Sequence, residues 1–156
     1  MILNVLAVGK AGRGPEADLV ARYVDRATAA GRQVGLTPLT VRELGDGTGP
    51  RRRDDEGARI LAAHSTGPLV LLDERGRSLT SLSLAQRLER WQADGESAVS
   101  FAIGGADGHA DTVRQAAGEI WSLSALTLPH LLARVVLVEQ LYRAITILSG
   151  HPYHRA

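Results

Sequence analysis

The sequence contains no cysteine, and Lys10 is the only lysine among its eighteen basic residues. The lack of cysteine excludes disulfides and thiolate metal ligands, and nothing demands an oxidising compartment. No apolar run approaches the roughly 20 residues that a membrane-spanning helix needs, and the first residues lack the basic stretch of a secretory signal peptide. We therefore expect a soluble, cytoplasmic protein.

Excess charge of either sign is also missing. Eighteen Lys+Arg and seventeen Asp+Glu give a formal net charge of +1, which excludes the strongly basic balance of a non-specific nucleic-acid coat. A nucleic-acid partner would have to be met by a local patch. Arginine suits bidentate phosphate contacts and stacking on bases, although genomic base composition favours arginine equally well.

The chain length and apolar content predict one compact domain over residues 1–156, because 156 residues with 44% hydrophobic side chains can bury a sizeable core. Apolar runs bounded by Gly, Pro and Asp alternate with stretches of helical period, which is typical of an α/β fold with a mostly parallel sheet and flanking helices. The predicted strands are Ile2–Val8, Val34–Val41, Leu69–Leu72, Val99–Ile103 and Ile120–Leu123. The predicted helices are Glu16–Ala30, Asp54–His64, Leu82–Ala93, Asp111–Ala117 and Leu131–Leu148.

The last predicted helix, Leu131–Leu148, is apolar on nearly every face rather than along one stripe. Such a helix needs burial on more than one side, either as a central core helix or between the sheet and a second subunit. Glu139 and Arg143 lie one turn apart, and we expect them to pair on its remaining polar face.

Three loops follow predicted strands at their carboxyl ends, where open α/β sheets usually bind ligands: Asp73–Gly76, Gly104–Gly108 and Ser124–His130. The glycines of the second loop let backbone approach a ligand, although a plain tight turn explains them about as well. Their Gly-Gly-x-x-Gly spacing, with no acidic ribose partner downstream, disfavours a nucleotide-binding oxidoreductase. The uncharged third loop suits an adenine or a thioether better than a phosphate; a buried connection capped by Ser or Thr is the other interpretation.

The C-terminal tail, Gly150–Arg155, carries two histidines, a tyrosine and an arginine. Aromatic and cationic side chains stack on unpaired bases and hold their phosphates, whereas the ordinary interpretation is a frayed polar end. The spacing of the histidines does not predict a metal site. Elsewhere, His64 is expected at the surface of a helix end, and His109 is expected to touch either ligand or solvent.

Two C-terminal motifs, Trp121–His130 and His151–Arg155, are long and specific, and the short segment Leu141–Ala144 lies between them. With Val8-Gly9-Lys10 and Ile103-Gly104-Gly105, they make essentially the whole chain resemble the RlmH family, large-subunit rRNA pseudouridine N3-methyltransferases of the SPOUT superfamily. The resemblance implies S-adenosyl-L-methionine as methyl donor, a homodimer, and N3 of a pseudouridine in 23S rRNA of the large ribosomal subunit or assembled ribosome as acceptor. It also implies a C-terminal trefoil knot, which no sequence pattern predicts and which general topology rules disfavour.

The resemblance further assigns a donor pocket and a tail that completes the site of the other subunit. The implied donor-binding residues are Leu72, Gly104, Leu123, Ser124, Ala125, Leu126, Thr127 and Leu128. Within the tail, residues 149–156, His154 is our candidate acceptor of the N3 proton, since histidine exchanges protons near neutral pH. Tyr153 would stack on or hydrogen-bond the base, and Arg155 would hold phosphate or favour negative charge on the base carbonyls. Arg134 and His130 are further candidates, with a salt bridge or a helix cap as the alternative.

The chain departs from the family pattern at Ala106–His109, where a Pro-Glu-Gly turn is common, and at Ala156, where an acidic residue is frequent. Arg51–Arg53 is either an electrostatic foothold for RNA or a solvated loop whose charge Asp54–Glu56 offsets. The main alternative function is a non-catalytic RNA- or ribosome-binding module of the same fold.

Overall fold

The computed structural model describes residues 1–155, so Ala156, the last residue of the predicted tail, lies outside the described residues. The strands are β1 (Ile2–Val8), β2 (Leu39–Leu44), β3 (Leu69–Ser78), β4 (Ala98–Ile103) and β5 (Glu119–Ser122). The α-helices are α1 (Pro15–Gly31), α2 (Arg52–Ala63), α3 (Ser81–Ala93), α4 (Asp111–Ala116) and α5 (His130–Ser149). Short 3-10 helices occupy Arg32–Val34, Gly49–Arg51 and Pro152–His154.

The five strands form one parallel sheet in the order β2-β1-β4-β3-β5. Every residue of the central strand β4 is buried, because helices cover both of its faces and neighbouring strands pair with both of its edges. The predicted α/β fold with a parallel sheet and flanking helices is therefore confirmed.

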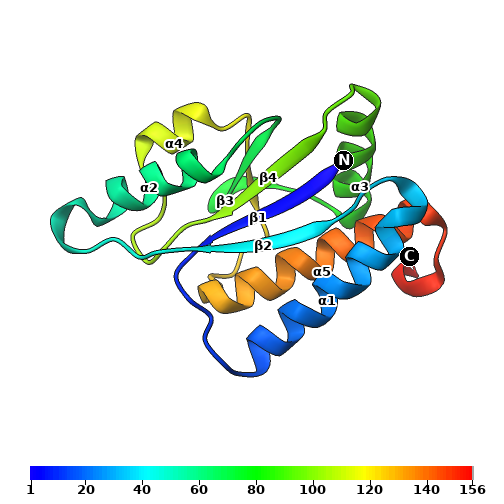
Figure 1. Cartoon of the computed structure of the whole chain (residues 1–156), viewed down its shortest axis with the longest axis horizontal. Coiled ribbons are helices and arrows are strands. Elements are labelled where there is room, and N and C mark those ends of the chain that lie inside the picture. The colour runs from blue at the N-terminus through cyan, green and yellow to red at the C-terminus, as the bar shows by residue number, and fades with distance from the viewer. Residues whose placement is uncertain (156) are drawn as a thin grey trace.

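Side chains alternate along the strands between two cores. Leu3, Val5 and Ala7 of β1 belong to the core under α1, α3 and α5. Leu6 and Val8 belong to the opposite core, which α2 and α4 cover. Figure 1 shows α1 and α5 side by side on one face, with α2 and α4 on the other. The molecule thus has three layers, α/β/α. Because all five strands are parallel, their carboxyl ends point to the same edge of the sheet.

The packing of helix α5 accounts for part of its apolar character. It packs against α1, α3 and β4, and its fully buried residues include Leu137, Leu141 and Ile145. It is thus a central core helix, as one of the two sequence interpretations holds. Leu132, near its beginning, is nevertheless 42% exposed, so part of its apolar surface is left uncovered within one chain.

Two predicted strands differ from the structure. The strand predicted over Val34–Val41 occupies Leu39–Leu44 instead, because Gly35 turns the chain at φ +71° and Pro38 has no N–H to donate to a sheet. The predicted loop Asp73–Gly76 is a continuation of β3, whose pairing with β5 shifts between Leu72 and Arg77. At the shift, a Cβ on Gly76 would lie 2.6 Å from the carbonyl carbon of Trp121, so this irregular passage requires glycine.

Candidate functional site

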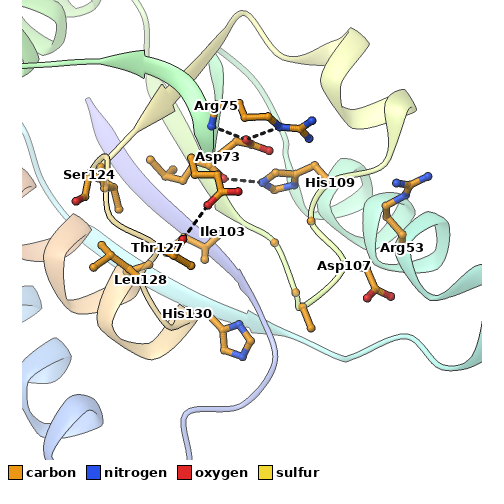
Figure 2. Close-up of a pocket in the computed structure, with 18 of the residues that line it drawn as sticks. Arg53, Asp73, Arg75, Ile103, Asp107, His109, Ser124, Thr127, Leu128 and His130 are labelled. Atoms are coloured by element: carbon orange, nitrogen blue, oxygen red, sulfur yellow. Dashed lines mark hydrogen bonds and ion pairs between the residues drawn. The ribbon is translucent and has the colours of Figure 1, made fainter.

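A cavity of about 730 Å³ lies at the carboxyl edge of the sheet, bounded by the middle of β3, the loop after β4 and the loop after β5. This volume falls within the roughly 300–1,000 Å³ of small-molecule sites. Figure 2 shows side chains from all three segments turned toward the same space. The edge of the sheet that was predicted to bind a ligand therefore contains a cavity of suitable size.

The loop after β5 forms one wall of the cavity. Trp121, just before it, is buried, and its Nε1–H donates to Glu119 Oε2 at 2.6 Å, which fixes the end of the strand. Ser122 Oγ donates to the Ser124 carbonyl at 2.9 Å, and Ser124 Oγ accepts the N–H of Leu126 at 2.9 Å. These local bonds hold the loop in a shape that neither helix nor strand would produce.

Carboxylates, among them those of Asp73 and Glu74, line the rim of the cavity. Burial raises the pKa of Asp73, but the Arg75 backbone N–H, which donates to it at 2.8 Å, and its ion pair with Arg114 outweigh burial and lower that pKa. Glu74 Oε2 accepts the Thr127 hydroxyl at 3.2 Å (Figure 2), which ties β3 to the loop after β5. The carboxylate oxygens can accept ribose hydroxyls or cationic ligand groups, while Arg53, Arg75 and Arg114 line the same cavity and provide positive charge.

The glycine loop after β4 closes the cavity from the side of α2 and α4. Its turn is held by the Gly108 N–H, which donates to the Gly105 carbonyl at 3.1 Å. A Cβ on Gly105 would lie 2.6 Å from Oε2 of the buried Glu56, so the close approach of α2 requires glycine here. His109 is only 4% exposed, and its Nε2 lies 3.1 Å from the Leu72 carbonyl oxygen. Of the two alternatives for His109, exposure to solvent is therefore wrong, whereas its place in the lining of the cavity is compatible with ligand contact.

Arg134 is buried beside the cavity and paired. Its Nη1 donates to Glu43 Oε2 at 2.5 Å, and its Nη2 to the Gly9 carbonyl at 3.3 Å. Glu43 also accepts the Ala11 N–H at 2.7 Å; this bond and then Arg134 lower the pKa of Glu43 against the effect of burial. The salt-bridge interpretation of Arg134 is confirmed. His130 begins α5 and lines the cavity.

Within the arginine triplet Arg51–Arg53, one residue fits the interpretation as a helix start and the other two fit the interpretation as a foothold for RNA. Arg52 Nε lies 3.1 Å from Glu56 Oε1 one turn along α2, so part of its charge is offset as expected of a helix start. Arg53 lines the cavity (Figure 2), and Arg51 is exposed.

His64 caps the other end of α2, but it is half-buried, with Nδ1 3.0 Å from the Ser100 hydroxyl. It is thus less exposed than the sequence suggested.

The tail is docked on α5 rather than frayed. The Tyr153 hydroxyl donates to Glu139 Oε1 at 2.9 Å, and its ring lies 4.6 Å from that of Tyr142. Arg143 stacks over the same ring and also donates to Glu139 at 2.6 Å, so the predicted Glu139–Arg143 pair is confirmed. Burial, Tyr23 and Glu139 raise the pKa of Tyr153, which keeps its phenol protonated at neutral pH.

The two halves of the predicted site lie at opposite ends of α5. His130 at the beginning of the helix lines the cavity, whereas Pro152–His154 follows its end at Gly150. Because 20 helical residues span about 30 Å, the tail does not reach the cavity of its own chain. Figure 1 shows the beginning of α5 near the middle of the molecule and its end at the right, beside the tail.

Seven of the eight predicted donor-binding residues line the cavity; Ala125 does not. The structure keeps the three predicted tail residues together on the 3-10 helix and just after it, with Nδ1 of His154 buried and unpartnered.

Sequence reasoning missed the Asp73–Arg114 ion pair and the contact of Glu56 with the glycine loop. Neither has a local signal, because both join residues of different elements.

Residues 1–155 contain neither a metal-binding cluster of side chains nor a helix suited to span a membrane. No three or more Asp, Glu or His side chains in this range are grouped closely enough to hold a metal ion. None of the helices in the described range combines the length and the apolar character that a bilayer crossing needs.

Known proteins resemble this chain along its whole length. Residues 1–154 match the family described as "Predicted SPOUT methyltransferase". Curated relatives named ribosomal RNA large subunit methyltransferase H include one from Xanthobacter autotrophicus, 48% identical over all of both chains. Another, from Mesorhizobium japonicum, is 47% identical over all of both chains.

A crystal structure of a methylase-family protein from Neisseria gonorrhoeae matches the fold with a TM-score of 0.51 and 14% identity, covering 99% of this chain and 94% of that one. The structural match supports the fold alone. The family match and the sequence identity over the full length show that this chain is homologous to these methyltransferases. The chain therefore belongs to the SPOUT methyltransferase family, among the relatives named ribosomal RNA large subunit methyltransferase H.

Proposed function

We propose that this protein methylates ribosomal RNA of the large subunit, at N3 of a pseudouridine in 23S rRNA, with S-adenosyl-L-methionine as donor. The observation that carries the proposal is the three-sided cavity at the carboxyl edge of the sheet, in a chain that matches rRNA large subunit methyltransferases along its full length. The setting would be the large subunit or assembled ribosome in the cytoplasm.

The cavity residues fit the donor. Leu72, Leu123 and Leu128 supply apolar wall, and Gly104 lets backbone approach a flat ring or a thioether. The carboxylates of Asp73 and Glu74 face the same space and can accept ribose hydroxyls or the ligand's ammonium group. When bound there, S-adenosyl-L-methionine supplies an electrophilic methyl group on its sulfonium. The protein's task is then to align the acceptor nitrogen and exclude water.

The tail provides the groups that handle the base. His154 takes the proton of N3 as the nitrogen attacks, and Arg155 holds a phosphate or the negative charge that develops on the base carbonyls. Tyr153 offers its ring to the base while its protonated phenol remains bonded to Glu139. The Arg143 guanidinium, over that ring and bonded to the His154 carbonyl at 3.3 Å, orients the segment.

A homodimer makes one site from these two halves. The tail and the cavity of one chain lie about 30 Å apart along α5, so a tail can complete only the cavity of another subunit. Leu126 and Leu132, beside the cavity and 75% and 42% exposed, provide apolar surface suited to such an interface. A cavity covered by a second subunit would also lose its access to bulk water.

The trefoil knot belongs to the same proposal. Strand β3 lies between β4 and β5 in the sheet, so the chain running from β4 to β5 crosses β3. The cavity is built from β3 and from the two loops on either side of that crossing. In the proposed knot, these three segments would together form the donor site.

RNA would approach over the rim of the cavity. Arg53 on the rim and the exposed Arg51 beside it provide a local cationic foothold. The net charge of +1 argues that recognition relies on the shape of the assembled subunit rather than on overall attraction.

Calorimetric titration with S-adenosyl-L-methionine separates this proposal from the alternative of a non-catalytic binding module. We expect a saturable heat with a Kd on the order of micromolar, as for an ordinary enzyme ligand. Asp73→Ala, which removes a rim carboxylate, should weaken binding, while Arg90→Ala on the far helix α3 should not. The absence of any donor heat in the folded protein would favour the alternative.

The acceptor is tested on ribosomes. Mass spectrometry of 23S rRNA from a deletion strain should show one pseudouridine lacking a methyl group, and treatment of those ribosomes with purified protein and donor should restore it. Restoration on a base other than pseudouridine would contradict the N3 assignment while leaving rRNA methylation intact.

A further inference from the structure

His109 stands at the contact between two walls of the cavity. It follows the glycine loop, and its ring Nε2 lies 3.1 Å from the carbonyl oxygen of Leu72 on β3 (Figure 2). A Cβ on Gly104 would lie 3.2 Å from Cε1 of the same ring, so the imidazole packs directly against the glycine loop. The ring therefore lies in contact with both Leu72 and Gly104, two residues that line the cavity just where the pairing of β3 with β4 ends at Leu72 and Ile103.

The hydrogen bond fixes the protonation state of this ring. A carbonyl oxygen only accepts, so Nε2 must carry the proton that it donates to Leu72. In the neutral ring, Nδ1 then has only a lone pair. Nδ1 is buried and has no hydrogen-bond partner, which costs much less for a neutral acceptor than for a charged N–H donor.

The surroundings of the ring oppose a positive charge. Burial lowers the pKa of His109, and Arg114 on α4 lowers it further. The carbonyls of Leu72 and Ala102 and the Asp73 carboxylate act in the other direction without reversing the shift. Asp73 is itself paired with Arg114, so little of its charge is free to stabilise an imidazolium.

We infer that His109 is a positioning residue of the donor cavity: its neutral ring joins β3 to the glycine loop in the binding-competent spacing, and a second proton on the ring releases that spacing and weakens donor binding. This inference rests on the proposed function, since it names a regulator of the same cavity. An apolar residue would fill the space, but it would not donate to Leu72. Histidine adds both the bond and its dependence on pH.

The direction of the effect follows from the protonation states. If the donor binds only the neutral-ring form, its affinity is constant at pH values well above the pKa of His109. Below that pKa the affinity falls by up to about tenfold per pH unit, because a proton must leave before binding. Since the pKa is lowered, the fall begins at a more acidic pH than for an exposed histidine.

The test is titration of the dimer with S-adenosylhomocysteine, which has no sulfonium charge to repel an imidazolium, between pH 8 and pH 5. We expect the Kd for wild type to rise at acidic pH. His109→Gln keeps an N–H near the position of Nε2 and does not titrate, so it should bind nearly as wild type at pH 8 and keep its affinity at pH 5 much better. His109→Leu fills the space without donating and should bind more weakly than His109→Gln at both pH values.

His64→Gln is the matched control, because this half-buried histidine does not line the cavity and its variant should retain the wild-type pH profile. In NMR spectra without ligand, the ring of His109 should titrate at lower pH than an exposed histidine. Equal pH profiles for wild type and His109→Gln, or equal binding by the Gln and Leu variants, would overturn the inference while leaving the donor assignment standing. A folded wild type that binds no S-adenosylhomocysteine at pH 8 would contradict the proposed function as well.

Discussion

Removal of Tyr153 through Ala156 is expected to reduce methyl transfer at least about 100-fold, the lower end of what a positioned acid or base contributes, while the Kd for the donor changes less than about threefold. The reason is the separation of the two halves: the groups proposed to handle the base lie in the tail, and the cavity at the other end of α5 contains none of them. Single-turnover methylation of unmodified ribosomes and donor calorimetry on the same preparation measure the two quantities.

Point variants locate the effect within the tail. His154→Gln should lose most of the rate and make the remaining rate less dependent on pH, since the proposed proton acceptor is gone. Glu139→Gln should act through Tyr153 and Arg143, which its carboxylate holds, and should raise the KM for ribosomes more than it lowers kcat. Arg90→Ala, in an exposed pair with Asp94 on α3, is the control. Full turnover by the truncated protein would refute these roles.

Sequence patterns predicted the bounds of a strand correctly where the strand is buried on both faces. The apolar runs of β1 and β4 match the predicted strands within one residue, because strands covered on both faces are apolar throughout. The edge strand β2 was misplaced: its residues Thr40, Arg42 and Glu43 are polar, and the apolar Val34 and Leu36 before it belong to a 3-10 helix and to the segment that follows this helix. A strand that pairs on one edge only has too weak a pattern to compete with the apolar segment beside it.

The positions of the candidate site were predictable in outline, and its contacts were not. Parallel strands place their following loops at one edge, so the strand pattern of the sequence is enough to bring Gly104 and Thr127 to the same side of the sheet. The partner of Asp73 is Arg114 from another element, and no spacing in the chain indicates it. The length of α5, in contrast, could have shown at once that the tail lies far from the cavity of its own chain.

The proposed sharing of each site between two subunits predicts rescue between two inactive proteins. Gly104→Val should abolish donor binding, because even a Cβ at this position lies 3.2 Å from the His109 ring and a branched side chain crowds it further. Mixed with the tail-truncated protein under conditions of subunit exchange, it should recover about a quarter of wild-type activity, since about half of the dimers are mixed and each has one complete site. Either protein alone should remain inactive.

A second pair of subunits separates a site shared between chains from a site within one chain. When both changes are carried by the same subunit and this subunit is paired with wild type, each of the two shared sites has one defective half, either the cavity or the tail, so the mixed dimer should be inactive. A site within one chain would give the opposite result in both pairings: activity in this dimer and none in the first. Mixed dimers purified through two different affinity tags and assayed on unmodified ribosomes therefore decide whether the tail beyond Gly150 acts on the cavity at His130 of the same chain or of its partner.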